Sequence, residues 1–468
     1  MTTSPSSPPP GPSHAGAAPR ISAVVLAAGQ GTRMRSALHK VLHPVGGKPL
    51  IQRALDLAVG VGADDPVVVL GHLPEQVRAV LPPSTRTVVQ EPQRGTGHAV
   101  QVAADLLRQD GADRLLVLYG DTALVEPSTL RQLVNQPVAP DVPIALLTAR
   151  LPNPYGYGRV LRAADGTVAG MVEESEATDE QRQVNEIWSG LLVAWAPWVW
   201  EQLWQLEPRA KGEYYLPDLV NLARGAGLKV LAVEAPSADE VHGVNDRAQL
   251  AQANAILWRR TAERLMQAGV TILDPARTYI DSDVEVGEDT VIYPGCFLRG
   301  RTRIATGCVI GPDTDLFNAR VGEGTRVVRS TVEDSTLGNH VRVGPYAHVR
   351  GGATIEDDVE LGNYAEVKGS RIGRGTKQHH FSYVGDADIG ERVNLSAGII
   401  TMNYDGRVKH RTVVGDDAFI GSDTLLRAPI RVGKAARTGA GAVVIHDVPD
   451  GEVWAGVPAR RLSPKDAP

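Results

Sequence analysis

The sequence predicts two domains of different fold class, an α/β domain with a mostly parallel sheet and then a left-handed parallel β-helix of hexapeptide repeats. Two observations predict this. In residues 21–246, short apolar runs alternate with segments of 3.6-residue spacing, as expected of strands interleaved with helices. Beyond residue 270, aliphatic residues return in blocks at every sixth position, with small residues four places later, which is typical of a β-helix.

The composition is that of a globular protein with small-molecule partners. The chain has 468 residues, of which 43% are apolar and 22% charged, enough for two or three domains with ample cores. A net charge of -6 and the absence of a basic tract argue against nucleic acid as a partner. No stretch approaches the ~18 apolar residues of a membrane span. Residues 1–20 are rich in Pro, Ser, Gly and Ala and lack the apolar segment of a signal peptide, so we expect a disordered extension on a cytoplasmic protein.

The α/β domain is predicted at residues 21–246. Its buried strands are ISAVVLAAG, DPVVVLG, TRTVVQ and DRLLVLYGD, and two of its helices are KPLIQRALDLAVGVGA and TGHAVQVAADLLRQDGA. Such Rossmann-like sheets bind ligands beyond the carboxyl ends of their strands. Residues 247–269 contain no proline and no glycine before Gly269, which predicts a connecting helix.

The β-helix is predicted at residues 270–468, with a short tail at its end. Cys296 and Cys308 each lie four places after an aliphatic position, in the small inward slot. Two cysteines are too few for a disulfide framework, and we interpret both as core residues without a metal or redox role. The repeated aliphatic positions are Val286, Ile292, Leu298, Ile304 and Ile310, then Leu337, Val343, Val349, Ile355, Leu361 and Val367, then Val414, Ile420, Leu426 and Val432.

The first strand runs into LAAGQGTRM, a candidate phosphate-binding loop. It lacks the third glycine of a dinucleotide fingerprint and the Gly-Lys-Ser/Thr of a P-loop. Gly29 and Gly31 still allow close approach of the backbone to a phosphate, and Arg33 and Lys40 supply positive charge. The alternative is a plain turn with a surface arginine. Asp121, at the carboxyl end of another strand, is well placed to hold Mg²⁺ beside a triphosphate.

These motifs, with KVLH, QRGTGHA, YGD, ATDEQRQ, GEYYLPDL and GVN, resemble those of the sugar-1-phosphate nucleotidyltransferases. In particular they resemble the bifunctional bacterial enzymes that make UDP-N-acetylglucosamine, in which a glucosamine-1-phosphate acetyltransferase is joined to an N-acetylglucosamine-1-phosphate uridylyltransferase. The resemblance extends from Ile21 to about Pro458. It implies a nucleotidyltransferase domain, an acetyltransferase β-helix and a role in supplying precursors of the cell wall, of peptidoglycan and lipopolysaccharide.

For the first domain, the resemblance implies attack of the sugar phosphate on the α-phosphorus of UTP, with release of pyrophosphate and with Mg²⁺ as cofactor. Arg33 and Lys40 would be the catalytic cations, and Asp121 and Asn245 the metal ligands. The remaining implied contacts are Leu26, Ala27, Ala28 and Gly29 around the nucleotide, Gln90, Gly95 and Thr96 on the uracil, Tyr119 and Gly120 beside Asp121, and Gly158 and Glu173 on the amino sugar.

One position departs from the family pattern. In NEIWSG, relatives usually carry asparagine where this chain has Trp188, at a position that contacts the sugar. A tryptophan can stack on a sugar face but cannot replace both hydrogen bonds of the amide. The two interpretations are an altered sugar selectivity and a repacked pocket wall with unchanged selectivity.

In the β-helix, two cations recur at equivalent places. Arg350 follows the inward Val349, and Lys368 follows the inward Val367, one coil of 18 residues later. Equivalent positions of successive coils lie about 4.8 Å apart. Like charges at this spacing destabilise the fold unless an anion lies between them, and a sugar phosphate is the obvious anion. The alternative is that both side chains splay apart into solvent.

The hexapeptide period breaks at two places. In KQHHFSYVG the aliphatic position holds Gln378, and alternation places Ser382 and Val384 inward and Tyr383 outward. Alternation leaves the two neighbouring histidines, 379 and 380, at a corner and does not choose between them. The second break is TMNYDGRVKHRT, residues 401–412, which we interpret as an extruded loop.

The resemblance continues through GPYAHVRGGA, LGNYAEVKGSRIG, HFSYVGDADIG, NLSAGIITMNYDG and IGSDT. It selects His380 as the general base that takes the proton of the attacking amine, a task for which histidine has a suitable pKa. His379 would have no such role. The implied contacts are Arg350, Lys368, Tyr383 and Asn394 for the sugar phosphate, and Ala397, Asn403, Tyr404, Ser422 and Ala440 for acetyl-CoA, with Arg460 or Arg461 in place of a carboxyl-terminal arginine of the family.

Three hypotheses follow. The first is a bifunctional enzyme, the second a single-activity nucleotidyltransferase whose β-helix is a structural or regulatory module, and the third a non-catalytic scaffold. A scaffold leaves Asp121 and Arg33 unexplained, and a structural β-helix leaves His380, Arg350 and Lys368 unexplained. Because the predicted loop at residues 401–412 lies on a half-open face, we also expect a homotrimer with a site shared between chains.

Overall fold

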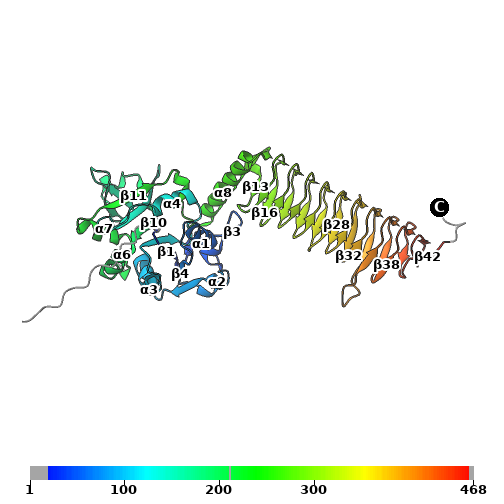
Figure 1. Cartoon of the computed structure of the whole chain (residues 1–468), viewed down its shortest axis with the longest axis horizontal. Helices are drawn as coiled ribbons and strands as arrows, with labels where there is room; N and C mark the ends of the chain where they lie inside the picture. The colour runs from blue at the N-terminus through cyan, green and yellow to red at the C-terminus, as the bar shows by residue number, and fades with distance from the viewer. Residues whose placement is uncertain (1–18, 210–211, 463–468) are drawn as a thin grey trace, which may run out of the picture. The chain divides into compact units, whose positions relative to one another are not determined.

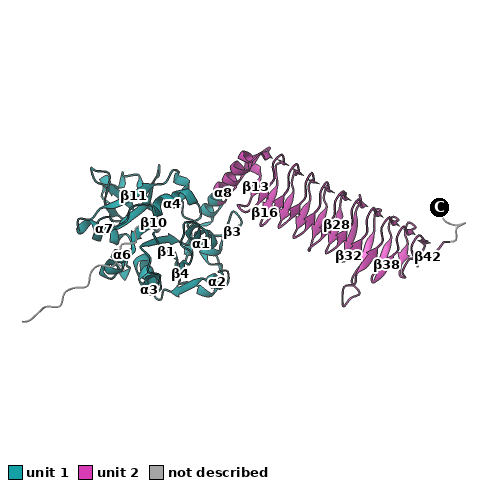
Figure 2. Cartoon of the chain, viewed as in Figure 1, with its two compact units in different colours: residues 1–253 teal, residues 254–468 magenta. Residues whose placement is uncertain are grey.

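The computed structural model describes residues 19–209 and 212–462, so most of the predicted amino-terminal extension and the end of the carboxyl-terminal tail lie outside the described residues. The chain divides into two compact units, residues 1–253 and 254–468 (Figure 2). The helix α8, Arg247–Gln267, spans this division. No helix in the described ranges combines the length and apolarity that crossing a membrane requires.

The first unit is built on one mixed sheet whose central strands are parallel (Figure 1). All four strands predicted from the apolar runs are confirmed. The strand β10 is antiparallel to both of its neighbours, and the hairpin β8–β9 extends from it. In spatial order the strands are β11 (Val230–Glu234), β7 (Ile144–Arg150), β10 (Glu186–Trp195), β6 (Arg114–Tyr119), β1 (Ile21–Ala27), β4 (Val67–Leu70) and β5 (Arg86–Val89), with β8 (Arg159–Arg162) and β9 (Val168–Val172) beside them.

Helices pack on this sheet through apolar faces. The two predicted helices are confirmed as α1 and α3, and α3 buries Val100, Ala103 and Leu107 in the core that it shares with β1 and β4. Burial of side chains the size of Val100 and Leu107 stabilises the fold by about 1.5–3 kcal/mol each. The helices are α1 (Leu50–Gly60), α2 (Pro74–Arg78), α3 (Gly95–Gln109), α4 (Pro127–Val134), α5 (Asp179–Arg182), α6 (Ala196–Gln202) and α7 (Asp218–Gly225), with short 3₁₀ turns η1 (Thr32–Met34), η2 (Lys40–Leu42) and η5 (Ala238–Val241).

The second unit is the predicted β-helix. Short strands pair in parallel with the equivalent strand of the next coil, as β15 (Val291–Ile292) does with β18 (Val309–Ile310), and so form three parallel sheets along the stack of coils seen in Figure 1. Every predicted inward aliphatic residue is buried except Val286, which is half-buried. The Cys296 and Cys308 thiols are buried in the same core, and burial raises the pKa of both.

Between Ile310 and Leu337, where the six-residue count restarts, equivalent inward positions of successive coils lie fewer than 18 residues apart. Where the period fails, some corners are one residue shorter, so Ile310 pairs with Val327 and Val327 with Val343 while the coil continues. The predicted loop is also shorter than residues 401–412. Thr401 lies in β34 (Ile400–Met402) and Thr412 in β35 (Thr412–Val414), so only residues 403–411 project from the coils in Figure 1.

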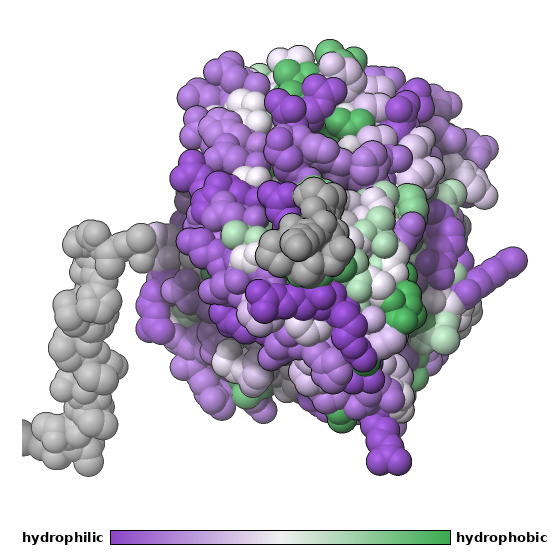
Figure 3. Space-filling model, turned by 90° about the vertical axis from the view of Figure 1, so that its right-hand side faces the viewer, coloured by the Kyte–Doolittle hydropathy of each residue, from purple (hydrophilic) through white to green (hydrophobic). Residues whose placement is uncertain are grey.

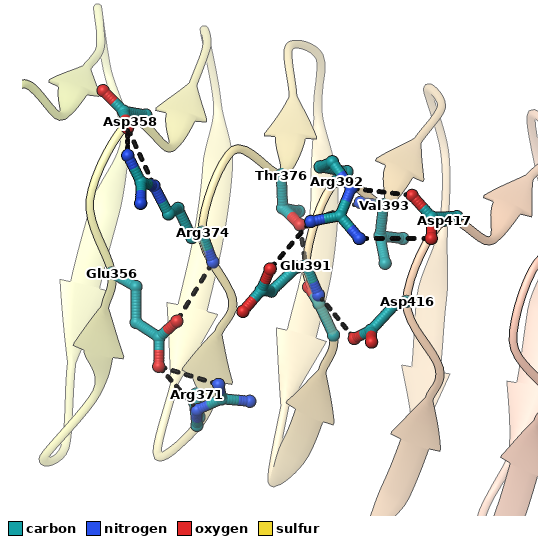
Figure 4. Close-up of polar contacts among 11 residues, drawn as sticks. Glu356, Asp358, Arg371, Arg374, Thr376, Glu391, Arg392, Val393, Asp416 and Asp417 are labelled. Atoms are coloured by element: carbon teal, nitrogen blue, oxygen red, sulfur yellow. Dashed lines mark hydrogen bonds and ion pairs between the residues drawn. The ribbon is translucent and has the colours of Figure 1, made fainter.

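Charged side chains cross-link successive coils on the outer surface. Arg374 pairs with Asp358 at 3.0 Å, and Arg392 pairs with Asp417 at 2.8 Å (Figure 4). Exposed pairs of this kind each contribute only about 0–1 kcal/mol. Seen from the side of the carboxyl-terminal coils, the surface is mostly hydrophilic, with small scattered hydrophobic patches (Figure 3). The buried aliphatic columns, more than these pairs, hold the coils together.

Gln378 is the one polar exception that the sequence predicted among the inward positions. It lies in β30 (Lys377–Gln378), is fully buried, and pairs with Leu361 and Leu395 of the adjacent coils. Its Nε2 donates to Ser382 Oγ at 2.9 Å, but its Oε1 is buried without a hydrogen-bond partner.

We therefore expect Gln378→Leu to raise the melting temperature. The substitution removes a buried acceptor that has no hydrogen-bond partner, which costs about 1–3 kcal/mol, and puts an aliphatic side chain in its place. The matched control is Leu395→Ala at the equivalent position of the next coil, which should lower stability by about 2–5 kcal/mol. Thermal denaturation followed by circular dichroism measures both. A Gln378→Leu variant that melts below the parent would contradict this account.

Candidate active sites

The loop after β1 carries the first group of predicted residues. Leu26 and Ala27 end the strand, and Ala28 and Gly29 follow it. Gly31 has a φ of 62°, and a Cβ atom there would lie 2.7 Å from Lys40 Cβ, so only glycine allows the loop to close on Lys40.

A cavity of about 410 Å³ lies at the carboxyl edge of the sheet. It brings together most of the residues predicted to bind a nucleotide, from five separate parts of the chain. Arg33, exposed in η1, is not among the residues that line it. Gly120 does not line it either, and a Cβ built on Gly120 would lie 3.0 Å from Val41 Cγ1. The lining includes the predicted Leu26, Ala27, Ala28, Gly29, Lys40, Gln90, Gly95, Thr96, Tyr119, Asp121 and Asn245, and the unpredicted Val41, Gln93, Ala99 and Glu213.

The start of α3 is fixed by the segment GEYYLPDL. The Gly97 amide donates to the Tyr214 carbonyl at 2.8 Å, and the Leu216 amide donates to Thr96 Oγ1 at 3.0 Å. Gly95 has a φ of 86°, and a Cβ there would lie 2.6 Å from the Tyr214 carbonyl oxygen. The two motifs, far apart in the sequence, therefore form one wall of the cavity.

Lys40 links the two predicted metal ligands. Its Nζ donates to Asp121 Oδ2 at 2.6 Å and to Asn245 Oδ1 at 3.2 Å. Two oxygen ligands thus converge on one point, and a carboxylate with an amide oxygen suits Mg²⁺, which needs few protein ligands. The donor set fits the metal, although the ammonium of Lys40 lies beside both ligands in this structure.

A second cavity, of about 250 Å³, adjoins the first and shares Tyr119, Asp121 and Asn245 with it. Trp188 forms part of its wall, edge-on to Tyr119 with ring centroids 6.5 Å apart. The Trp188 indole N–H donates to the Leu191 carbonyl at 2.9 Å. The indole therefore offers this cavity a ring surface and no free donor. Burial raises the pKa of the Tyr119 hydroxyl.

Gly158 and Glu173 lie side by side near this second cavity, since a Cβ on Gly158 would be 3.5 Å from Glu173 Oε2. Neither lines it directly, but Tyr157 does. Burial raises the pKa of the Glu173 carboxyl. The neighbouring Arg159, which the sequence did not single out, is buried, pairs with Glu174 at 2.6 Å and also donates to the Tyr157 carbonyl.

In the β-helix, Arg350 and Lys368 pair in register between β25 (His348–Arg350) and β28 (Ala365–Lys368), as predicted. The anions that this structure places beside the two cations are carboxylates, which the sequence analysis did not consider. Arg350 pairs with Glu366 at 2.5 Å, and Lys368 approaches Asp386 at 3.8 Å, so carboxylates of the same chain already balance both charges.

The projecting loop folds back on this cluster. Asn403 is buried, and its Nδ2 donates to Asp386 Oδ2 at 2.6 Å and contacts the Tyr383 hydroxyl at 3.4 Å. Asn403 is therefore held within its own chain. Lys409, which sequence reasoning missed, lies near Lys368, and that ammonium lowers the pKa of Lys409. The sequence did not indicate Lys409, because the loop that carries it does not follow the hexapeptide repeat.

His379, His380 and Phe381 form the corner between β30 and β31 (Ser382–Gly385), where all three are exposed. Alternation in β31 is as predicted, with Ser382 and Val384 buried. The His379 ring pairs with Glu360 at 2.9 Å, a partner that the sequence did not indicate.

The corner of His380 continues into a column of small residues. Gln378, Leu395, Ile420 and Thr438 pair in turn, which puts the residues two places later at equivalent positions of successive coils. Those residues are His380, Ala397, Ser422 and Ala440. The predicted acetyl-CoA contacts thus follow His380 along one corner.

The remaining predicted contacts are more scattered. Asn394 lies half-buried in β33 (Asn394–Leu395), on a different sheet from Tyr383, and its Nδ2 donates to Ser396 Oγ at 3.0 Å. Tyr404 is 59% exposed on the projecting loop. Arg461 pairs with Glu452 at 3.2 Å, and Arg460 donates to the Ala459 carbonyl.

Comparison with known proteins places both halves in one family. Residues 23–184 match the family model of the MobA-like NTP transferase domain, and residues 334–369 match that of the bacterial transferase hexapeptide (six repeats). The bifunctional protein GlmU of an Exiguobacterium species is 47% identical over 92% of this chain and 95% of its own length. Those of Brevibacillus brevis (45% identical, 92% and 94% covered) and Kineococcus radiotolerans (46%, 94% and 90%) are similar to the same extent. With both halves matched along nearly the whole length of these relatives, the chain belongs to the family of bifunctional GlmU proteins, whose acetyltransferase and uridylyltransferase motifs its sequence resembles.

Proposed function

We propose that this chain acetylates glucosamine-1-phosphate with acetyl-CoA in its β-helix and then transfers UMP from UTP to N-acetylglucosamine-1-phosphate in its α/β domain, giving UDP-N-acetylglucosamine and pyrophosphate. The observation that carries the proposal is the grouping of the predicted residues of each half at one place in its own unit. A single-activity nucleotidyltransferase is not favoured, because the relatives match the β-helix as fully as the α/β domain.

For uridylyl transfer, the two adjoining cavities support a division of labour. The larger cavity would hold UTP, with Gln90 and Gly95 beside the uracil and Lys40 beside the phosphates. The smaller cavity would hold the sugar phosphate. The sugar phosphate oxygen attacks the α-phosphorus, the bond to pyrophosphate breaks, and no covalent enzyme intermediate is needed, because positioning and charge neutralisation supply most of the rate.

Asp121 and Asn245 would hold Mg²⁺ at the boundary of the two cavities. The ion, when bound, would neutralise the charge that develops on the phosphates. Lys40 would then exchange its bonds to Asp121 and Asn245 for bonds to a phosphate. Arg33, exposed in η1, would be available to the outer phosphates.

For acetyl transfer, the sugar phosphate would lie against Arg350 and Lys368, and its amine would attack the thioester carbonyl of acetyl-CoA. His380 would accept the proton that the amine loses, and CoA would leave as the thiol. Tyr383 and Asn394 would contact the sugar. The column of Ala397, Ser422 and Ala440 leaves room along one corner for the cofactor. Because Glu366 and Asp386 pair with the two cations, the phosphate would have to displace or share these carboxylates.

We also propose that the chain acts in the cytoplasm as a homotrimer, supplying precursors for peptidoglycan and lipopolysaccharide. The exposed corner supports a shared acetyl-transfer site. His380, Phe381 and Tyr404 are all exposed, so a neighbouring chain can complete a site that one chain leaves open.

Changing His380 to Ala should reduce CoA release from glucosamine-1-phosphate and acetyl-CoA by about 100-fold or more, the usual contribution of a general base. Pyrophosphate release from UTP and N-acetylglucosamine-1-phosphate should continue unchanged. The matched control is His379→Ala, whose ring pairs with Glu360 and should be nearly silent in both assays. Equal effects of the two variants on CoA release would refute the assignment.

Changing Asp121 to Ala should have the opposite pattern. Pyrophosphate release should fall by at least about 100-fold, as expected on loss of a group that organises transition-state charge, while CoA release is retained. Asp113→Ala, at the residue just before the same strand β6, is the matched control and should keep both activities. If Asp113→Ala were as damaging as Asp121→Ala, the loss would reflect the stability of β6.

A site shared between chains predicts complementation. Neither His380→Ala nor Tyr404→Ala alone should support normal acetyl transfer, but co-expression of the two variants should restore part of the CoA release, because mixed trimers contain some sites with both native residues. Sedimentation measures the trimer, and each variant expressed alone is the control. Failure of the mixture to exceed the single variants in a proven mixed trimer would place both residues in one chain's site.

A further inference from the structure

We infer that His98 is a positioning residue that makes the base pocket selective for uracil, by holding the amide of Gln90 in one orientation. The inference rests on the proposed use of UTP. His98 lies in α3, one turn beyond Gly95, and is itself not among the residues that line the nucleotide cavity. Its effect on the base would therefore pass through Gln90, which does line that cavity.

Gln90 is only 3% exposed, and its side-chain nitrogen has two neighbours. Nε2 donates to the Gly95 carbonyl oxygen at 2.8 Å and lies 3.1 Å from His98 Nδ1. A carbonyl oxygen only accepts, so the atom facing Gly95 must be the amide nitrogen. The amide orientation is thus fixed by the chemistry of its neighbours.

The same reasoning fixes the form of the histidine. Both hydrogens of the amide are used if Nδ1 of His98 accepts the second one, which requires a neutral imidazole with its proton on Nε2. Burial and the nearby Arg94 lower the pKa of His98, which favours this neutral form. Protonated His98 would present an N–H to the amide nitrogen and lose the bond.

This arrangement leaves one amide atom for a ligand. With both hydrogens used, Oε1 of Gln90 has no hydrogen-bond partner within residues 19–209 and 212–462 and can only accept. Uracil has a ring N–H at N3, whereas the unprotonated N3 of cytosine is an acceptor. When N3 of the base faces this oxygen, uracil donates to it and cytosine leaves it unpaired, and a site that leaves a polar group unpaired with the wrong ligand discriminates strongly.

The experiment compares His98→Leu with His98→Asn. Asparagine places its Oδ1 on Cγ, the atom that carries Nδ1 in histidine, so it keeps an acceptor at the same place, whereas leucine keeps bulk and loses the acceptor. We expect His98→Leu to raise the KM for UTP and to lower the preference for UTP over CTP, measured with CTP as a competing inhibitor, by about three- to tenfold.

The kcat at saturating UTP and the KM for N-acetylglucosamine-1-phosphate should stay unchanged, and His98→Asn should recover most of the preference for UTP. If His98 had a purely structural role, His98→Leu would lower the stability of the protein without changing its preference for UTP over CTP. If His98→Leu does not fold, His98→Ala gives the same comparison.

An unchanged preference in His98→Leu, or equal losses in the leucine and asparagine variants, would overturn the inference. Failure of the wild-type chain to release pyrophosphate from UTP would instead overturn the proposed function. The two failures are distinguishable because the wild type is measured in the same assay.

Discussion

The parallel pairing of each strand with its equivalent in the next coil is the constraint on which the β-helix depends. This register stacks Val349 on Val367 inside and, by the same repeat, Arg350 on Lys368 outside. It also carries the corner of His380 into the column of small residues below it. A core requirement, the burial of one aliphatic residue per strand, thus fixes the spacing of the groups proposed to act on the sugar phosphate.

Both proposed active sites hold their cations in pairs with carboxylates of the same chain. Lys40 contacts Asp121, Arg350 contacts Glu366, and Lys368 approaches Asp386. A phosphate ligand must therefore compete with an internal anion or join it. This pairing keeps the cations oriented before the ligand arrives, and it reduces the net attraction for anions that cannot replace the carboxylate bonds.

Much of the fold could be predicted from the sequence because the spacing of apolar residues follows from which side chains are buried. The period of six located the aliphatic column, and the apolar runs located β1, β4, β5 and β6. The short corners were missed because they change the spacing without changing the coil. Contacts such as Lys40 between Asp121 and Asn245, or His379 with Glu360, join residues whose separation follows no pattern. His98 was missed because the sequence does not indicate that a single histidine in this helix contacts Gln90.

The loop at residues 403–411 illustrates how the coil accepts additions. Thr401 and Thr412 remain buried in their strands, and Thr401 Oγ1 accepts a hydrogen bond from the Gly385 amide at 2.8 Å. Pairing therefore resumes beyond the loop, with Leu395 against Ile420. The length and composition of the loop therefore do not affect the pairing of the strands on either side of it. The residues of this loop can therefore change without a change in the strand register of the β-helix.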